Sequence, residues 1–211
     1  MTVVELATGA EMRLTGAGAT AVVCVNGGQA SEVAGTWSAS LEWLVGRLAP
    51  RFPALVFAEV RYRIKSWKQL DGCIADARAA VREVGAERAL MLGFSMGGAV
   101  AISVSDEPSV EGVLGLAPWI PDRLSVEPIA GKRLDVLHGS LDRYLPGIPG
   151  VSPTPSRRGF DRALAVGATG TYELIPGAVH GIALRAHWGR PIRLPRAAEW
   201  ERRIAAQLEK L

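Results

Sequence analysis

A serine between glycines is the strongest chemical signal in the sequence. Ser95 lies in the segment Gly-Phe-Ser-Met-Gly-Gly, residues 93–98, whose G-x-S-x-G spacing is typical of a nucleophile at a sharp turn from a strand into a helix. In such a turn the backbone is strained and the chain doubles back, so a side chain at Gly93 or Gly97 would collide with neighbouring backbone. The spacing predicts a nucleophilic Ser95 hydroxyl; the alternative is a glycine-rich turn with an idle serine.

A serine hydroxyl is a weak nucleophile and needs a base, for which the chain offers three histidines. His180 lies in Pro-Gly-Ala-Val-His-Gly, residues 176–181, in the loop after the last predicted strand. It is the preferred base. His138 lies at the end of the preceding strand, where we expect a structural role beside the site. His187 lies farther along the chain and is the fallback base.

The base needs a carboxylate that holds its tautomer and stabilises the imidazolium. Asp142 lies just past a predicted strand end, four residues after His138 and 38 residues before His180. Asp135 begins the same strand, so we expect it at the wrong end of the sheet. The remaining acids that we considered lie on surface connections or on a predicted helix: Asp106, Glu107, Glu111, Asp122, Glu127 and Asp161. Asp142 is therefore the predicted acid.

The apolar pattern predicts the elements that position these residues. Compact apolar runs indicate buried strands, and apolar residues spaced i, i+3, i+4, i+7 indicate helices. Strands are expected at 3–6, 11–14, 19–25, 54–60, 88–94, 110–117, 134–137 and 171–175, and helices at 41–48, 70–84, 96–104, 157–166 and 195–211. This order predicts one α/β domain over residues 1–211, with a mostly parallel sheet covered by helices on both faces. Catalytic groups then belong just beyond the carboxyl ends of the strands.

Three segments, in chain order, resemble the signature segments of the α/β-hydrolase superfamily. They are Gly-Phe-Ser-Met-Gly-Gly around Ser95, His-Gly-Ser-Leu-Asp ending at Asp142, and Gly-Ala-Val-His-Gly around His180. The chain is similar to small esterase and dienelactone-hydrolase-like members, over nearly its whole length. The resemblance implies a twisted sheet of about eight strands with the Ser–Asp–His triad at its carboxyl edge. Dienelactone hydrolases carry a cysteine nucleophile, so the serine here argues against that substrate.

A second departure lies in the loop after residues 19–25, which reads Asn26-Gly27-Gly28 where these proteins usually have His-Gly. The resemblance implies that this loop supplies a backbone N–H to the oxyanion hole, a role that needs no histidine side chain. By position we assign it to Gly28, with Gln29 as the alternative; an ordinary tight turn is the other interpretation. The Met96 N–H, at a helix N-terminus, is the predicted partner donor.

The interval from 120 to 133 is about 14 residues long, too short for the helical cap that related proteins insert there. We therefore expect an open, shallow site without a cap domain. Trp119 and Tyr144 are the predicted substrate contacts, and Trp67 and Tyr62 are further candidates for the pocket wall. Three arginines near strand ends could attract an anionic acyl group, although solvated side chains are the favoured interpretation: Arg61, Arg63 and Arg143.

The composition excludes several other classes of protein. The 211 residues are 48% hydrophobic and 21% charged, which indicates a globular protein with a sizeable core. The net charge of +3 comes from arginines spread along the chain, so no nucleic-acid partner is expected. Cys24 and Cys73 lack metal-ligand or redox spacing. Residues 1–14 do not read as a secretory signal, and no apolar run of about 18 residues indicates a membrane span.

Together these features predict a cytoplasmic serine hydrolase of the carboxylesterase type, acting on a small ester through an acyl-enzyme on Ser95. We expect no metal, organic cofactor or membrane partner. The oligomeric state stays open. A thioesterase, peptidase or acyltransferase with the same triad is the alternative, as is an α/β-hydrolase fold that binds a ligand without turnover.

Overall fold

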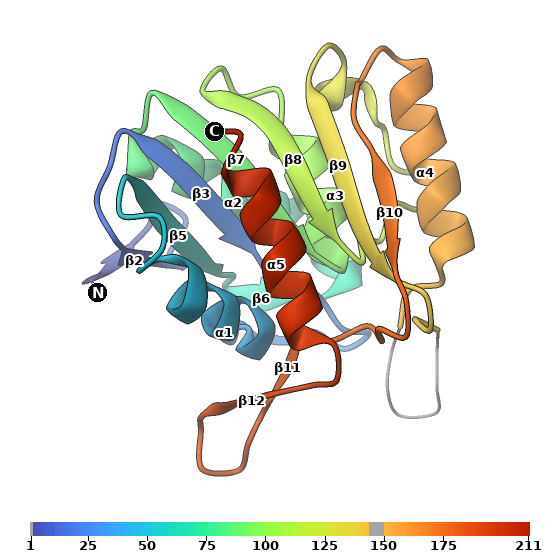
Figure 1. The fold of residues 1–211 in the computed structure, drawn as a ribbon. Helices are drawn as coiled ribbons and strands as arrows, with labels where there is room; N and C mark the ends of the chain where they lie inside the picture. Colours follow the sequence, from blue (N-terminus) through green and yellow to red (C-terminus); the bar gives the residue numbers. More distant parts are fainter. Residues whose placement is uncertain (1, 144–149) are drawn as a thin grey trace.

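One eight-stranded sheet forms the centre of the molecule in a computed structural model that describes residues 2–143 and 150–211 (Figure 1). Its strands lie in the order β1-β2-β5-β3-β7-β8-β9-β10. Their bounds are Thr2–Glu5 (β1), Glu11–Thr15 (β2), Thr20–Val25 (β3), Leu55–Arg61 (β5), Arg88–Phe94 (β7), Val110–Leu116 (β8), Arg133–Gly139 (β9) and Tyr172–Ile175 (β10). β2 pairs antiparallel with both β1 and β5, and every pairing from β5 across to β10 is parallel. The carboxyl ends of β3, β7, β8, β9 and β10 therefore share one edge.

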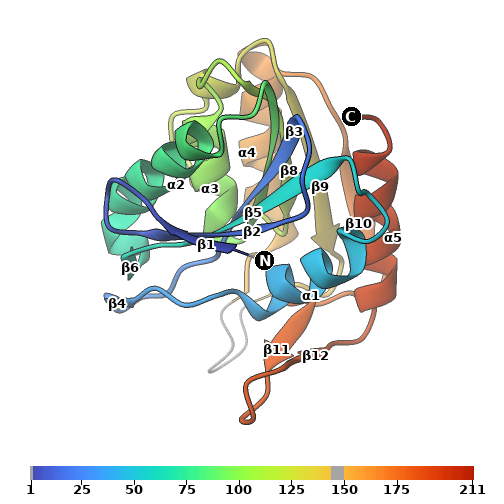
Figure 2. The same ribbon diagram turned by 90° about the vertical axis from the view of Figure 1, so that its left-hand side faces the viewer.

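Helices cover both faces of this sheet (Figure 2). They are α1 (Ala39–Leu48), α2 (Leu70–Val84), α3 (Met96–Val104), α4 (Pro153–Ala165) and α5 (Ala197–Leu208). The apolar sides of α1 and α5 pack with one face of the sheet in one hydrophobic cluster. Those of α2, α3 and α4 pack with the other face in a second cluster. Because helices cover both faces, the central strands are apolar at nearly every position, as the sequence predicts.

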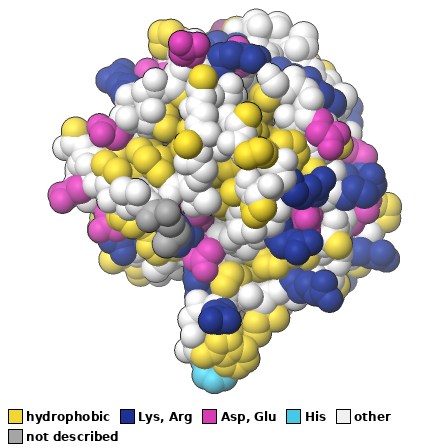
Figure 3. Space-filling view, turned by 60° about the vertical axis from the view of Figure 1, so that its left-hand side comes forward, with side chains coloured by type: hydrophobic (Ala, Val, Ile, Leu, Met, Phe, Trp, Pro, Cys, Tyr) yellow, Lys and Arg dark blue, Asp and Glu magenta, His cyan; other side chains and the backbone are white. Residues whose placement is uncertain are grey.

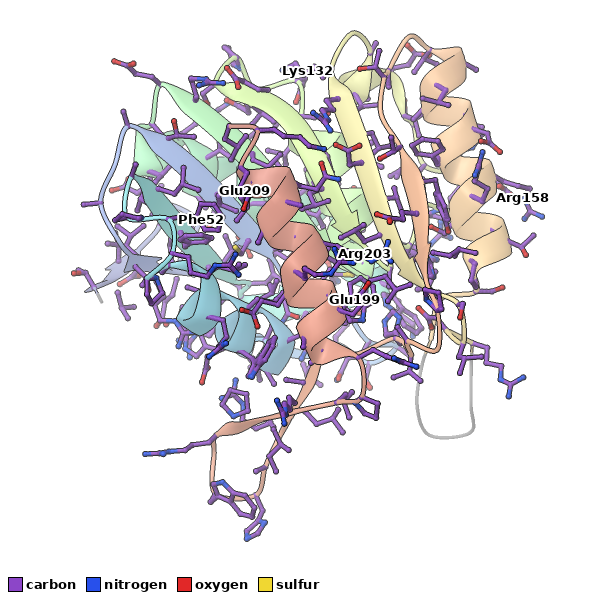
Figure 4. All side chains as sticks on the ribbon, viewed as in Figure 1. Phe52, Lys132, Arg158, Glu199, Arg203 and Glu209 are labelled. Carbon is purple, nitrogen blue, oxygen red and sulfur yellow. The ribbon has the colours of Figure 1, made fainter. Side chains whose placement is uncertain are left out.

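An ion-pair network ties α5 to β10, the strand at the edge of the sheet. Arg203 lies one turn after Glu199 on α5, and the two side chains point toward one another in Figure 4, with Nε 2.8 Å from Oε1. Arg203 also pairs with Glu173 on β10. The pairing holds the last helix against the strand that leads into the His180 loop.

The predicted elements agree closely with the observed ones, with three differences. α4 begins at Pro153 rather than at 157, because proline is tolerated in the first turn of a helix. The expected helix over 195–211 begins at Ala197, after Arg196 with φ of 68°. The short strands β11 (Ala183–Arg185) and β12 (Pro191–Arg193) were missed, as was the two-residue pair β4 (Val33–Ala34) and β6 (Ile64–Lys65). Strands of two or three residues are too short for a period to be visible.

β11 and β12 form a hairpin that projects from the molecule and carries hydrophobic side chains (Figure 3). Leu184 and Ile192 are cross-strand partners and are 59% and 47% exposed. The base of the hairpin is held on α1, where the Ser40 hydroxyl accepts hydrogen bonds from the Ile182 and Ala183 N–H groups. This anchor places the hairpin directly after the His180 loop.

The connection from β8 to β9 builds no cap. Residues 117–132 contain a single 3-10 turn, Glu127–Ile129. In the part of the chain that the structure describes, no helix has the length and apolar character needed to cross a membrane.

A pair of glycine substitutions tests the close approach of α3 to the sheet. A Cβ at Gly97 would lie 2.2 Å from the Val25 carbonyl oxygen, whereas a Cβ at Gly46, inside α1, would meet nothing within 4 Å. We expect Gly97→Ala to lower the free energy of unfolding by about 3 kcal/mol. Gly46→Ala should raise it by about 0.5–1 kcal/mol, because alanine loses less backbone entropy in a helix. Urea denaturation measures both, and equal effects of the two substitutions would contradict the steric argument.

Candidate active site

Ser95 occupies a strained turn between β7 and α3. Its φ of 56° and ψ of −120° lie outside the regions that non-glycine residues favour. Backbone hydrogen bonds hold this conformation: the Ser95 N–H donates to the Leu116 carbonyl on β8, and the Trp119 N–H donates to the Ser95 carbonyl. A Cβ at Gly93 would lie 2.3 Å from the Gly97 carbonyl oxygen. The glycines on both sides thus permit the close contact that keeps Ser95 in this turn.

The structure brings the predicted nucleophile, base and acid together. His180 Nε2 lies 3.0 Å from Ser95 Oγ, and His180 Nδ1 lies 2.7 Å from Asp142 Oδ2. Asp142 follows β9 and His180 follows β10, so the three side chains meet because their strands end at the same edge of the sheet. The Phe94 ring packs on His180, with ring centroids 5.1 Å apart.

The hydrogen-bond directions follow from the chemistry of the three groups. A carboxylate only accepts, so Nδ1–H of His180 donates to Asp142. A neutral imidazole then has its lone pair on Nε2, where it accepts from the Ser95 hydroxyl. The Ser95 residue is 9% exposed and the His180 side chain 15% exposed, so the reacting atoms lie at the surface of the site while Asp142 lies beneath them.

The Asp142 carboxylate is fully buried but well supplied with donors. The Val151 N–H donates to Oδ1 at 3.0 Å, and His138 Nε2 lies 3.2 Å from Oδ2, the oxygen that also accepts from His180. Burial by itself raises the pKa of Asp142, but the hydrogen bonds from His138 and His180 outweigh it, so the pKa lies below the ordinary value. The carboxyl is therefore ionised at neutral pH.

The two predicted oxyanion donors lie against each other. A Cβ at Gly28 would lie 2.2 Å from Met96 Sδ, so the loop after β3 packs directly on the first residue of α3. The neighbouring Gly27 N–H is already used, because it donates to Asn26 Oδ1 at 2.7 Å. Among the hydrogen bonds of the described residues, neither the Gly28 nor the Met96 N–H has an acceptor within the protein. The oxyanion-hole role of these two amides stays a prediction.

The predicted pocket residues differ in where they lie relative to Ser95. Trp119 lies next to the turn, bonded to the Ser95 carbonyl through its N–H, and its ring has the Arg123 guanidinium 5.8 Å from its centroid. Tyr144 lies outside the described residues. Trp67 borders the site, since its ring would be 2.7 Å from a Cβ at Gly28. Tyr62 is not a pocket wall: it is 2% exposed and its hydroxyl donates to the Asn26 carbonyl, so it supports the loop from below.

Several other candidates are accounted for by their contacts. His187 lies in the exposed turn of the β11–β12 hairpin, with its ring 4.4 Å from that of Trp188, and His180 occupies the place beside Ser95. Arg61 pairs with Glu11, and Arg63 pairs with Asp76 at 2.9 Å. These two arginines therefore have structural partners of their own.

Neither cysteine is placed for metal or redox chemistry. Cys24 and Cys73 are both buried and unpaired, and burial raises the pKa of each thiol, to about 11 for Cys73. Within residues 2–143 and 150–211, no group of three or more His, Cys, Asp or Glu side chains is arranged to hold a metal ion.

The chain has the α/β-hydrolase fold. No protein-family model and no curated protein sequence matches it. A sugar hydrolase from Lactococcus lactis matches with a TM-score of 0.74 and 16% identity, over 99% of this chain and 97% of that chain. An esterase from Exiguobacterium antarcticum matches with a TM-score of 0.70 and 12% identity, over 99% of each chain. A serine hydrolase without a lid from Xanthomonas campestris matches with a TM-score of 0.57 and 15% identity, over 85% of this chain and 84% of that chain. At identities this low, the likeness shows the fold of this chain and does not show its activity. The finer resemblance to dienelactone-hydrolase-like members stays a prediction.

The lowered pKa of Asp142 predicts a pH-dependent contribution to stability. A carboxyl whose pKa is depressed by folding stabilises the protein above its ordinary pKa of about 3.9, and that stabilisation is lost as the pH falls through the folded value. The difference in unfolding free energy between wild type and Asp142→Asn should therefore shrink as the pH falls below about pH 4. Urea denaturation at pH 3–7 measures it, and a difference that does not change with pH would contradict the assignment.

Proposed function

We propose that this protein is a serine hydrolase of the carboxylesterase type, which cleaves a small ester through an acyl-enzyme on Ser95. The observation that carries the proposal is the continuous chain from Ser95 Oγ to His180 Nε2 at 3.0 Å and from His180 Nδ1 to Asp142 Oδ2 at 2.7 Å. Nucleophile, base and acid at hydrogen-bond distances are what acyl transfer requires. A site that only bound a ligand would need none of them.

Acylation follows from this geometry. As Ser95 Oγ attacks the ester carbonyl carbon, its proton moves to His180 Nε2, and Asp142 stabilises the imidazolium without taking the proton. The carbonyl oxygen becomes an oxyanion that accepts from the Met96 and Gly28 N–H groups. Each such donor is typically worth about 3 kcal/mol of transition-state stabilisation. The intermediate then collapses: the C–O bond to the alcohol breaks, and the alcohol leaves with the proton from Nε2.

Deacylation repeats these steps with water as the nucleophile. His180 Nε2 takes a proton from the water as its oxygen attacks the acyl carbon, and the same two amides bind the second oxyanion. Collapse breaks the bond to Ser95 Oγ, which recovers its proton from Nε2. The acid product leaves and the enzyme returns to its starting state with all protons accounted for.

The substrate side of the site is open. Residues 117–132 form no cap, and Trp119 lies beside the nucleophile turn. Trp67, whose ring lies beside Gly28, also lines a separate open cavity of about 660 Å³ with Lys68 and Arg123, and no residue of the triad is among the residues that line it. We propose Trp119 and Trp67 as substrate contacts, together with Tyr144. A site without a cap favours a small acyl group.

The same triad serves thioesterases, peptidases and acyltransferases. These differ from an esterase in pocket shape and in how well water is excluded. Because residues 117–132 form no cap over the site, we favour hydrolysis by water over acyl transfer to another acceptor.

Covalent labelling tests the nucleophile directly. A fluorophosphonate probe should label the wild-type protein, and Ser95→Ala should abolish the labelling because Ser95 carries the hydroxyl that contacts His180 Nε2. Hydrolysis of p-nitrophenyl acetate should fall by about 10³-fold or more in the same variant. His187→Gln is the matched control and should keep full activity. Labelling that persists in Ser95→Ala would refute the proposal.

A chain-length series tests the open site. Without a cap to cover a long acyl chain, kcat/KM for p-nitrophenyl esters should be highest for acetate and butyrate and should decline for octanoate and longer chains. Initial rates at substrate concentrations well below KM give this ratio. A preference for long chains would contradict the shallow site while leaving the assignment of Ser95 intact.

A further inference from the structure

The β11–β12 hairpin leaves three large apolar side chains exposed. Leu184, Trp188 and Ile192 are 59%, 61% and 47% exposed, on a hairpin that projects from the body of the molecule (Figure 3). Leu184 and Ile192 are cross-strand partners, so they share one face of the hairpin, and Trp188 lies in the turn between the two strands. Single apolar side chains scattered over a surface need no explanation, but three on one projecting hairpin do.

The fold holds only the other face of the hairpin. Arg185 lies on β11 next to Leu184, and its Nη1 is 3.1 Å from Oε2 of Glu42 on α1. Because successive residues of a strand point to opposite faces, Leu184 and Ile192 lie on the face opposite to Arg185. The apolar face is therefore turned away from the contact with α1 and toward solvent.

The charge on this part of the chain has one sign. Residues 174–198 contain no Asp or Glu and four arginines, at positions 185, 190, 193 and 196. Glu42 neutralises Arg185. Arg190 and Arg193 are exposed, and neither forms a salt bridge with a carboxylate of the residues that the structure describes. The hairpin thus combines exposed apolar side chains with two uncompensated positive charges.

An anionic lipid surface matches this combination. Indole rings favour the boundary between headgroups and acyl chains, aliphatic side chains enter that boundary, and guanidinium groups bind phosphate oxygens. The shape of the hairpin favours the same partner. A narrow projection exposes its tip on several sides, and a fluid lipid layer can surround such a tip, whereas a flat protein surface would cover one side of it.

A second copy of the chain fits this surface less well. A symmetric contact between two hairpins would bring Arg190 and Arg193 close to the same residues of the other copy, where like charges repel. Three apolar side chains, none of them fully exposed, also supply much less than the roughly 800 Å² per partner that a stable protein interface buries. Charge and area both favour lipid over self-association.

We propose that the β11–β12 hairpin docks this protein on an anionic lipid surface. Leu184, Trp188 and Ile192 enter the interface, and Arg190 and Arg193 contact the lipid phosphates. The expectation of no membrane partner rests on the lack of an apolar run that could span a bilayer, and docking at the surface needs no such run.

The docked orientation has a consequence for the site. The hairpin follows the His180 loop and projects on the side of the molecule where β8, β9 and β10 end (Figure 1). A lipid layer that holds the hairpin therefore lies on the side of the molecule that carries Ser95. This consequence rests on the proposed function, but the docking itself does not.

Co-sedimentation with lipid vesicles measures the docking. The wild-type protein should sediment with vesicles of phosphatidylcholine and phosphatidylglycerol in equal parts, and much less with phosphatidylcholine alone. Trp188→Ala should lower the partition coefficient on the anionic vesicles by about tenfold, because a large apolar side chain no longer enters the interface. Arg190→Gln should lower it by about fivefold, the effect of one positive charge near an anionic surface.

A matched pair of leucines provides the control. Leu184→Ala should weaken vesicle binding, whereas Leu164→Ala, an exposed leucine on α4, should leave it unchanged. All these side chains are exposed, so each variant should keep the wild-type midpoint of urea denaturation. Ser95→Ala should bind vesicles like wild type, which separates the docking from the proposed function.

Two results would overturn the inference. One is a wild-type protein that does not sediment with anionic vesicles, or that sediments no better than Trp188→Ala. The other is a dimer in sedimentation equilibrium without lipid that Trp188→Ala dissociates, because the hairpin would then bind a second copy of the chain. The expected result without lipid is a monomer for both proteins.

Discussion

The close contact between β7 and α3 is the constraint on which the site depends. Gly93 and Gly97 face each other across the turn, and a Cβ on Gly93 would lie 2.3 Å from the Gly97 carbonyl oxygen. This close approach lets Ser95 hold a φ of 56° at the start of α3, with its Oγ within hydrogen-bond distance of His180. The strain is offset by the packing of α3, which is buried along almost its whole length. The same few residues therefore contribute to the packing of α3 and fix the position of the Ser95 hydroxyl.

The acid side of the site follows a different physical rule, the cost of burying charge. Asp142 lies beneath the reacting atoms, where water cannot solvate it, and its donors are Val151, His180 and His138. These donors keep the carboxylate ionised and orient His180 at the same time. The two histidines are not equivalent, because one faces Ser95 and the other faces Tyr172 in the interior.

The open rim follows from a short connection and a projecting hairpin. Residues 117–132 pass from β8 to β9 with one 3-10 turn, so Trp119 and Trp67 border the site without a cap over them. The β11–β12 hairpin leaves the molecule after the His180 loop, and Ser40 on α1 holds its base. It carries His187 away from Ser95, which is why the fallback base has no part in the proposed mechanism.

The sequence by itself determined the elements with strong local signals. α2, β7 and α3 have the predicted bounds, because apolar periodicity and a stop signal such as Gly85, with φ of 59°, are local properties of the chain. The G-x-S-x-G spacing and the chain order Ser95, Asp142, His180 likewise pointed to one edge of a parallel sheet. The short strands were not predicted because two or three residues show no period. The start of α4 was not predicted because the prolines there fit the first turn of a helix as well as a loop.

Only the tertiary structure decided which groups touch. The contact of His138 with Asp142, the use of the Gly27 N–H by Asn26, and the support of the carboxylate by the Val151 backbone all depend on segments that meet when the sheet assembles. Such contacts leave no mark on periodicity or spacing, because hydrogen-bond partners are selected by distance in space. For the same reason the sequence placed Tyr62 in the pocket, whereas packing places it beneath the loop, where its hydroxyl holds the Asn26 carbonyl.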